Sequence, residues 1–105
     1  MKTADELQQL ADLCEERGDY PKAARLHGKA LQAAERSYGK QSSELVSYLY
    51  NFGMIALTLG DNESAQKSFE RLLETLSTFG GSSADLEEVH QLLDSLTTGT
   101  LAANA

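Results

Sequence analysis

The sequence predicts an all-α fold built from helix-turn-helix hairpins that stack side by side. The first observation is an internal repeat, because Gly18-Asp19 and Gly60-Asp61 stand 42 residues apart and the apolar positions around them recur at the same offset. The second is spacing, since apolar residues recur at every third or fourth position, as on one face of an amphipathic helix. A shorter echo aligns residues 38–45 with residues 79–86. Two full hairpins and the start of a third are therefore expected.

Five helices are expected, and most have a recognisable start or stop signal. The expected spans are residues 4–17, 21–38, 44–59, 62–78 and 84–97. Thr3 and Glu6 have capping-box spacing for the first helix, and Gly18 can adopt the left-handed conformation that ends it. Pro21 is tolerated in the first turn of the second helix. The third helix is apolar on nearly every side and must be covered all round, whereas Asp61 can cap the fourth.

The chain is expected to form a single domain over residues 1–97. Its parts would be repeat one at about 3–40, repeat two at about 43–81, and a half repeat or capping helix at about 84–97. Residues 98–105 lack helical periodicity and contain few large apolar side chains. A disordered tail is therefore expected there.

Composition and charge argue against several classes of protein, including nucleic-acid-binding and membrane-spanning proteins. The 105 residues include 16 acidic and 9 basic side chains, and the net charge of −7 argues against binding nucleic acid or an anionic membrane. No stretch approaches the roughly 18 apolar residues of a membrane span, and no signal-peptide pattern follows Met1. Cys14 is the only cysteine and permits no internal disulfide. These features predict a cytoplasmic protein with basic or apolar partners.

The two units share a further pattern of large and small residues. The first shows Leu7-x-x-Leu10-Ala11-x-x-Cys14, Gly18-Asp19-Tyr20 and Ala23-x-x-x-His27; the second shows Leu49-x-x-Phe52-Gly53-x-x-Ala56, Gly60-Asp61 and Ala65-x-x-x-Phe69. This pattern resembles the tetratricopeptide repeat (TPR) family, and its long period is similar to the kinesin-light-chain-type branch. The resemblance implies a right-handed stack of hairpins, an α-solenoid fragment of two TPR-like repeats plus a fifth helix. It further implies a non-catalytic module that binds proteins and needs no cofactor.

The resemblance also implies that a partner would bind in a concave groove lined by the first helix of each hairpin. On that face the candidate groove residues are Gln8, Asp12, Glu15, Tyr50, Met54 and Leu57. The last three would be apolar anchors, and Asp12 and Glu15 would select for charge. Tyr50, Met54 and Leu57 could equally be core residues beneath the fifth helix, and the sequence leaves both interpretations open.

Charge changes sign between the two helices of the first hairpin. Residues 1–20 contain six acidic and two basic side chains, and residues 21–40 contain five basic and one acidic. The resemblance therefore implies an acidic groove and a basic outer face. Such a groove would repel the C-terminal carboxylate that some TPR domains hold with Lys, Arg and Asn. Two solvated faces that attract each other across one hairpin would give the same charge pattern.

Neither an enzyme nor a metal site is predicted. His27 and His90 are the only histidines, and no zinc-ligand spacing occurs. His27 replaces an aromatic residue at a helix-packing position, so a packing role is expected. Cys14 matches Ala56 of the second unit and is expected to be a small packed residue. The glycines and serines of residues 80–83 precede a helix without the lysine of a phosphate loop, so they are interpreted as a turn.

Two functions follow as hypotheses. The first is a module that binds a basic or amphipathic peptide or helix in an acidic and apolar groove. The second is a self-associating unit, because about three repeats are expected for independent stability and this chain has two and a half. Leu92, Leu93 and Leu96 of the fifth helix would then form a homodimer contact or, alternatively, cap the stack.

Overall fold

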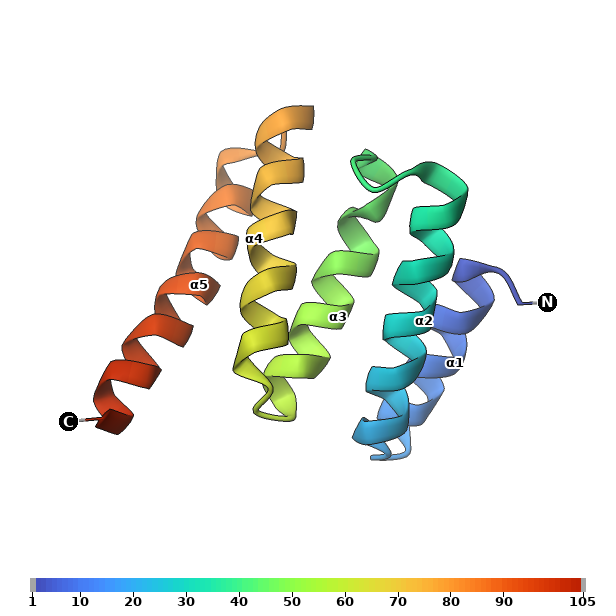
Figure 1. Ribbon diagram of the computed structural model, residues 1–105, viewed down its shortest axis with the longest axis horizontal. Helices are drawn as coiled ribbons and strands as arrows, with labels where there is room; N and C mark the ends of the chain where they lie inside the picture. The colour runs from blue at the N-terminus through green and yellow to red at the C-terminus, as the bar shows by residue number, and fades with distance from the viewer. Residues whose placement is uncertain (1, 105) are drawn as a thin grey trace.

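The helices of a computed structural model, which describes residues 2–104 and the side chains of residues 2–97, follow one another in the predicted order. They are α1 (Ala4–Glu16), α2 (Tyr20–Tyr38), the 3-10 helix η1 (Ser43–Leu45), α3 (Val46–Thr58), α4 (Asn62–Phe79) and α5 (Ser83–Asn104). Figure 1 shows them crossing the molecule from α1 at one end to α5 at the other. The described residues contain no strand, which confirms the all-α class.

The two hairpin turns have the same geometry, 42 residues apart. Gly18 and Gly60 have φ angles of +80° and +77°, in the left-handed region that favours glycine. The backbone N–H groups of Asp19 and Asp61 each donate to the carbonyl five residues back, at 2.8 and 2.9 Å. Their side chains each accept a hydrogen bond from the backbone N–H three residues on, which caps α2 and α4. The internal repeat of the sequence is therefore also a repeat of backbone structure.

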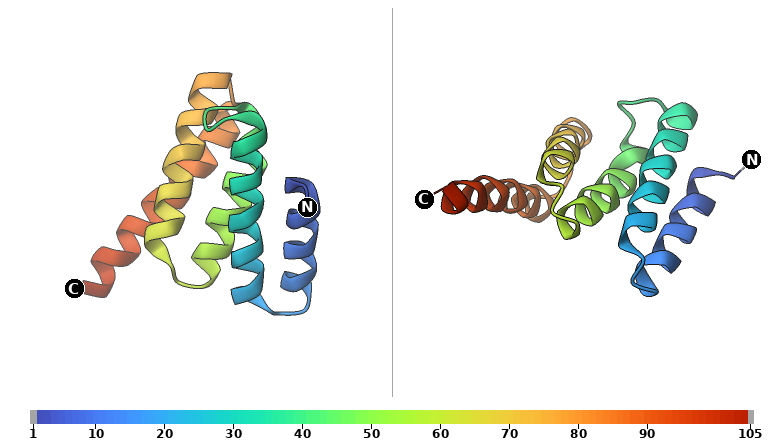
Figure 2. Two further views of the ribbon diagram at one scale, coloured as in Figure 1. Left: turned by 45° about the vertical axis from the view of Figure 1, so that its right-hand side comes forward. Right: turned by 60° about the horizontal axis from the view of Figure 1, so that its bottom comes forward.

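The hairpins are arranged in two layers. In the right-hand view of Figure 2, α2 and α4 lie on one side of the molecule, and α1, α3 and α5 lie on the other. Each helix packs on the next along the chain, and the contact of α2 with α3 joins the two hairpins. We call α1, α3 and α5 the first-helix layer, and α2 and α4 the second-helix layer.

A continuous apolar core runs between the layers. Its largest fully buried apolar side chains are Leu45, Leu49, Phe69 and Leu72, and buried alanines lie at the helix contacts. A Cβ atom at Gly53 would lie 2.6 Å from Phe69 Cε1, so α3 and α4 can approach this closely only because residue 53 is glycine. The sequence pattern therefore places a glycine where the ring of Phe69 packs against the backbone of α3.

One polar contact ties α1 to α3 across the core. The hydroxyl of the buried Tyr48 donates a hydrogen bond to a carboxylate oxygen of Asp5. Burial, and then this hydrogen bond, raise the pKa of Tyr48 above its usual value. The first turn of α1 is thereby fixed to the second hairpin.

The structure departs from the expected spans mainly at the start of α3 and the end of α5. Residues 43–45 form η1 because the Ser42 hydroxyl oxygen accepts from the Glu44 backbone N–H and caps a short turn there. The helical backbone of α5 continues to Asn104, where the sequence predicts a tail from residue 98. It extends past Leu96, the last buried side chain among the described residues. The disordered tail and the domain limits stay predictions.

Candidate functional site

The polar groove candidates lie on one face of α1, at spacings of four and three residues. Asp12 and Glu15 have side chains that are 60% and 40% exposed, and both lie close to His27 of α2. Glu15 Oε1 lies 2.5 Å from His27 Nε2, and Asp12 Oδ1 lies 3.8 Å from the same nitrogen. Gln8 is half-buried, and its Oε1 has no hydrogen-bond partner among the described residues. The structure therefore brings two of the three polar candidates together, around a histidine of the other layer.

His27 is a buried polar side chain at a position that an aromatic residue occupies in the second hairpin. Only 1% of it is exposed, and Phe69 is its counterpart at the 42-residue offset. Because a carboxylate can only accept a hydrogen bond, His27 Nε2 donates its hydrogen to Glu15. The other ring nitrogen, Nδ1, is buried and has no partner among the described residues. The bond to Glu15 therefore satisfies one of the two ring nitrogens and positions Glu15 beside α2.

Asp12, Glu15 and His27 also place three potential metal-ligand atoms within 4.8 Å of one another. A cation bound to His27 Nε2 would require the ring hydrogen to move to Nδ1. That N–H would then be a buried donor without an acceptor, whereas metal-bound histidines normally donate this hydrogen to a carboxylate or carbonyl. The cluster therefore suits a hydrogen-bonded contact better than a metal centre.

The sequence did not predict this cluster because its members come from two helices. The available signal was a histidine at a core position, opposite two acids one helical turn apart.

The apolar groove candidates, on α3, are half-buried. Tyr50, Met54 and Leu57 pack against the core and keep part of their surface exposed. The Tyr50 hydroxyl donates to Glu88 Oε1 of α5 at 3.1 Å. Burial, and then this bond, raise the pKa of Tyr50. These side chains thus contribute to packing and keep part of their surface exposed, and their role as partner-binding residues stays a prediction.

A cavity of about 260 Å³ lies beside Tyr50, between α3, α4 and α5. Its lining residues are Val46, Ser47, Tyr50, Asn51, Leu72, Leu76, Asp85, Glu88 and Val89. Leu72 and Val89 are buried and form its floor, whereas Ser47, Asp85 and Glu88 are exposed and form its rim. We call it the α5 cavity. Asp85 and Glu88 were missed by sequence reasoning, because the fifth helix has no complete second copy with which to compare them.

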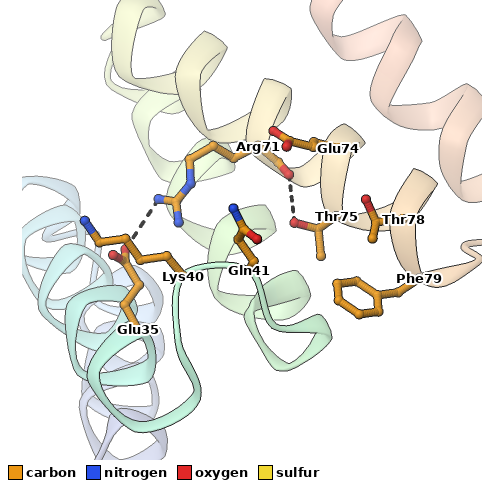
Figure 3. Close-up of a pocket in the computed structure, with 8 residues that line it drawn as sticks. All are labelled: Glu35, Lys40, Gln41, Arg71, Glu74, Thr75, Thr78 and Phe79. Carbon is orange, nitrogen blue, oxygen red and sulfur yellow. Dashed lines mark hydrogen bonds and ion pairs between the residues drawn. The ribbon is translucent and has the colours of Figure 1, made fainter.

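A second cavity, of about 450 Å³, lies in the second-helix layer between α2, the loop after it and α4. Figure 3 shows Arg71 reaching from α4 toward Glu35 of α2. Arg71 Nη1 lies 3.4 Å from Glu35 Oε1, and the Thr75 hydroxyl donates to the Arg71 carbonyl at 2.9 Å. Arg71 is therefore already paired, and its contact with Glu35 links the two hairpins through polar side chains at this cavity.

The three leucines considered for self-association belong to α5. Leu96 is 7% exposed and lies in the core of the same chain, and Leu92 and Leu93 are half-buried against that core. Val89, one turn before Leu92, is 3% exposed. This burial supports the interpretation of α5 as a cap on the stack, and leaves self-association through these leucines as a prediction.

Two hairpins with matched turns, stacked in two layers and continued by a further helix, define a helical-repeat protein of the α-solenoid class. A family model described as Tetratricopeptide repeat matches residues 3–78, which include α1 to α3 and nearly all of α4. The chain belongs to the tetratricopeptide repeat family. No curated protein matches it. Within residues 2–104, none of the helices combines the length and the apolar character needed to cross a bilayer.

Proposed function

We propose that the protein is a non-catalytic module that binds a basic or amphipathic segment of another protein along its first-helix layer. Family membership supports the general role, because tetratricopeptide repeats generally mediate protein–protein interaction. The 42-residue period supports a place in the kinesin-light-chain-like branch. The binding face would include Gln8, Asp12, Glu15, Tyr50, Met54 and Leu57.

The observation that carries this proposal is the distribution of charge between the layers. The sequence places no Lys or Arg within the bounds of α1, α3 or α5. The acidic residues of this layer all belong to α1 and α5, and α3 carries no charged side chain; they are Asp5, Glu6, Asp12, Glu15, Glu16, Asp85, Glu87, Glu88 and Asp94. The second-helix layer is of mixed sign: its basic residues are Lys22, Arg25, Lys29, Arg36, Lys67 and Arg71, and its acidic residues are Glu35, Glu63, Glu70 and Glu74. A layer of one sign attracts segments of the opposite sign and repels its own, so a basic partner is favoured.

Half-buried apolar side chains give the same layer a second kind of contact. Tyr50, Met54 and Leu57 belong to α3, and Figure 1 shows α3 between α1 and α5 in the stack. An amphipathic helix could place its apolar face on α3 and its basic residues toward α1 and α5. Charge would select the partner, and burial of apolar surface would supply much of the affinity.

Calorimetric titration with a designed amphipathic peptide tests the proposal. The peptide has leucines on one face and arginines on the other, and a matched peptide replaces arginine with glutamate. We expect saturable binding of the basic peptide that weakens as salt rises from about 50 to about 500 mM, because exposed charges are screened. The double variant Tyr50→Ala with Met54→Ala should bind the basic peptide more weakly than the unchanged protein does at the same salt concentration.

The control removes exposed aromatic residues outside the first-helix layer, with Tyr38→Ala and Phe79→Ala. These side chains are 51% and 54% exposed, so their loss should leave peptide binding unchanged. Equal binding of the acidic peptide, or an affinity that does not respond to salt, would contradict the proposal.

A further inference from the structure

The α5 cavity combines an apolar interior with a negatively charged rim. Leu72 and Val89 are 1% and 3% exposed and close its inner end. Its volume of about 260 Å³ is several times the roughly 30 Å³ share of one liquid water molecule, so it has room for part of a side chain. The shape and chemistry suit an occupant with an apolar stem and a cationic head.

Two carboxylates stand at the rim on one turn of α5. Asp85 and Glu88 are three residues apart, a spacing that makes side chains neighbours on a helix surface. Both are exposed, and no described ion pair neutralises either of them. Glu88 accepts one hydrogen bond, from the Tyr50 hydroxyl, which holds the carboxylate at the edge of the cavity. The rim is therefore an unneutralised pair of acids, one of which is held in place by a neighbouring helix.

We propose that the α5 cavity receives one arginine side chain of the bound segment, with its methylene stem between Leu72, Val46 and Val89 and its guanidinium between Asp85 and Glu88. This inference rests on the proposed function, since it specifies one contact of a basic segment on the first-helix layer.

Arginine fits the rim better than lysine for three reasons. Its planar guanidinium presents five N–H donors and can contact two carboxylates at once, whereas an ammonium is a compact point charge. It is also the more weakly hydrated cation, so partial burial costs less. Tyr50 lines the same cavity, and a guanidinium is attracted to the face of an aromatic ring more often than an ammonium is.

Titration with N-acetyl-arginine amide, followed by backbone NMR spectra of the full chain, tests the contact directly. We expect saturable shifts at Ser47, Asn51 and Val89, which line the cavity. N-acetyl-citrulline amide has nearly the same shape without the charge and should bind roughly tenfold more weakly, because charge-assisted hydrogen bonds are lost. The lysine analogue should fall between the two.

The variant Asp85→Asn with Glu88→Gln removes both rim charges and should weaken binding of the arginine amide by roughly tenfold. The matched control, Glu87→Gln with Asp94→Asn, removes the same charge from the same helix away from the cavity lining and should bind as the unchanged protein does. Circular dichroism of each variant checks that its helix content is unchanged. Equal binding by the two double variants, or equal binding of arginine and citrulline, would overturn the inference.

The same variants separate this inference from the proposed function. If the amphipathic arginine peptide binds with salt dependence but tolerates the rim variant, the first-helix layer binds basic segments and the arginine cavity is wrong. If the arginine amide occupies the cavity and no basic peptide binds, the cavity stands and the peptide-binding function is wrong.

Discussion

The positions at which the two helices of the second hairpin meet are occupied by different residues in the first. In the second hairpin Gly53 lies under the ring of Phe69, and the equivalent positions of the first hairpin, 42 residues earlier, hold Ala11 and His27. The first hairpin thus has a smaller ring than Phe69 and a larger residue than Gly53 at these positions. Ala11, His27 and Phe69 are all buried, and the close approach of Phe69 leaves no space for a side chain at residue 53.

Gly53→Ala is therefore expected to destabilise the protein. The new Cβ would lie 2.6 Å from Phe69 Cε1 and 2.9 Å from Cζ, and overpacking of this kind costs about 1–3 kcal/mol, more than the roughly 1 kcal/mol that alanine gains over glycine in a helix. Urea denaturation monitored by circular dichroism measures the change. Phe69→Leu in the Gly53→Ala background should recover part of the loss.

Gly28→Ala supplies the matched control. Gly28 also lies within a helix, but its added Cβ would meet Phe52 Cε1 at 3.4 Å, an ordinary contact. We expect unchanged or slightly raised stability, because alanine has the higher helix propensity. A loss at Gly28 equal to that at Gly53 would show that steric contact with Phe69 does not determine the effect.

Tyr48 is expected to make the free energy of unfolding decrease at alkaline pH. Its pKa is raised above the ordinary value of 10.0 by burial and by the hydrogen bond to Asp5, so the folded state holds the phenol proton more tightly than the unfolded state does. The stabilisation is complete below about pH 10 and decreases as pH rises above that value. Urea midpoints at about pH 8 and about pH 11 should therefore differ more for the unchanged protein than for Tyr48→Phe. Tyr50 remains in both proteins, so an equal decrease would exclude Tyr48 as the cause.

At the level of elements, the turns at Gly18 and Gly60 have the same geometry and join the two helices of each hairpin. Gly18 and Gly60 have positive φ angles, and a Cβ atom added to either would meet no other atom within 4 Å, so any effect of substitution there comes from the backbone. Gly18→Ala and Gly60→Ala should each lower the free energy of unfolding by about 1–2 kcal/mol, the cost of left-handed geometry for an L-residue. Denaturation of the two variants measures this. Markedly unequal losses would contradict the equivalence of the turns.

The sequence predicts these elements well because their signals are local. The capping box of Thr3 and Glu6, the Asp61 cap and the glycine turns all occur as the spacing indicates. The length of α5 was not foreseen, since the helical backbone continues where apolar periodicity ends. Contacts between elements were harder to predict: the approach of Glu15 to His27 and of Glu88 to Tyr50 depends on how helices are packed, which residue spacing within one helix does not encode.

At the scale of the whole molecule, charge differs between the two layers, whereas burial differs along the length of the stack. The acidic helix α1 and the basic helix α2 belong to opposite layers, so the change of sign within the first hairpin is a difference between the layers at that end of the stack. Burial instead depends on position along the stack. Each helix packs on the next one along the chain, and α5 covers the apolar surface of α4 at the end. The first-helix layer is the surface proposed for a partner, whereas the end of the stack is covered by α5 of the same chain.

Val89→Asp tests whether α5 acts as that cap. Val89 is 3% exposed beside Leu72 and Leu76 in the lining of the α5 cavity, so a buried carboxylate there should weaken the docking of α5 and uncover apolar surface of α4. We expect a lower thermal midpoint and, by light scattering, association that increases with protein concentration. The control Glu87→Lys changes an exposed residue of the same helix and should remain as monodisperse as the unchanged protein. If Val89→Asp keeps both its thermal midpoint and its mass at high concentration, α5 does not protect the end of the stack. If the unchanged protein already forms a dimer that Val89→Asp dissociates, α5 is the interface between copies, and the self-association of Leu92, Leu93 and Leu96 replaces the cap.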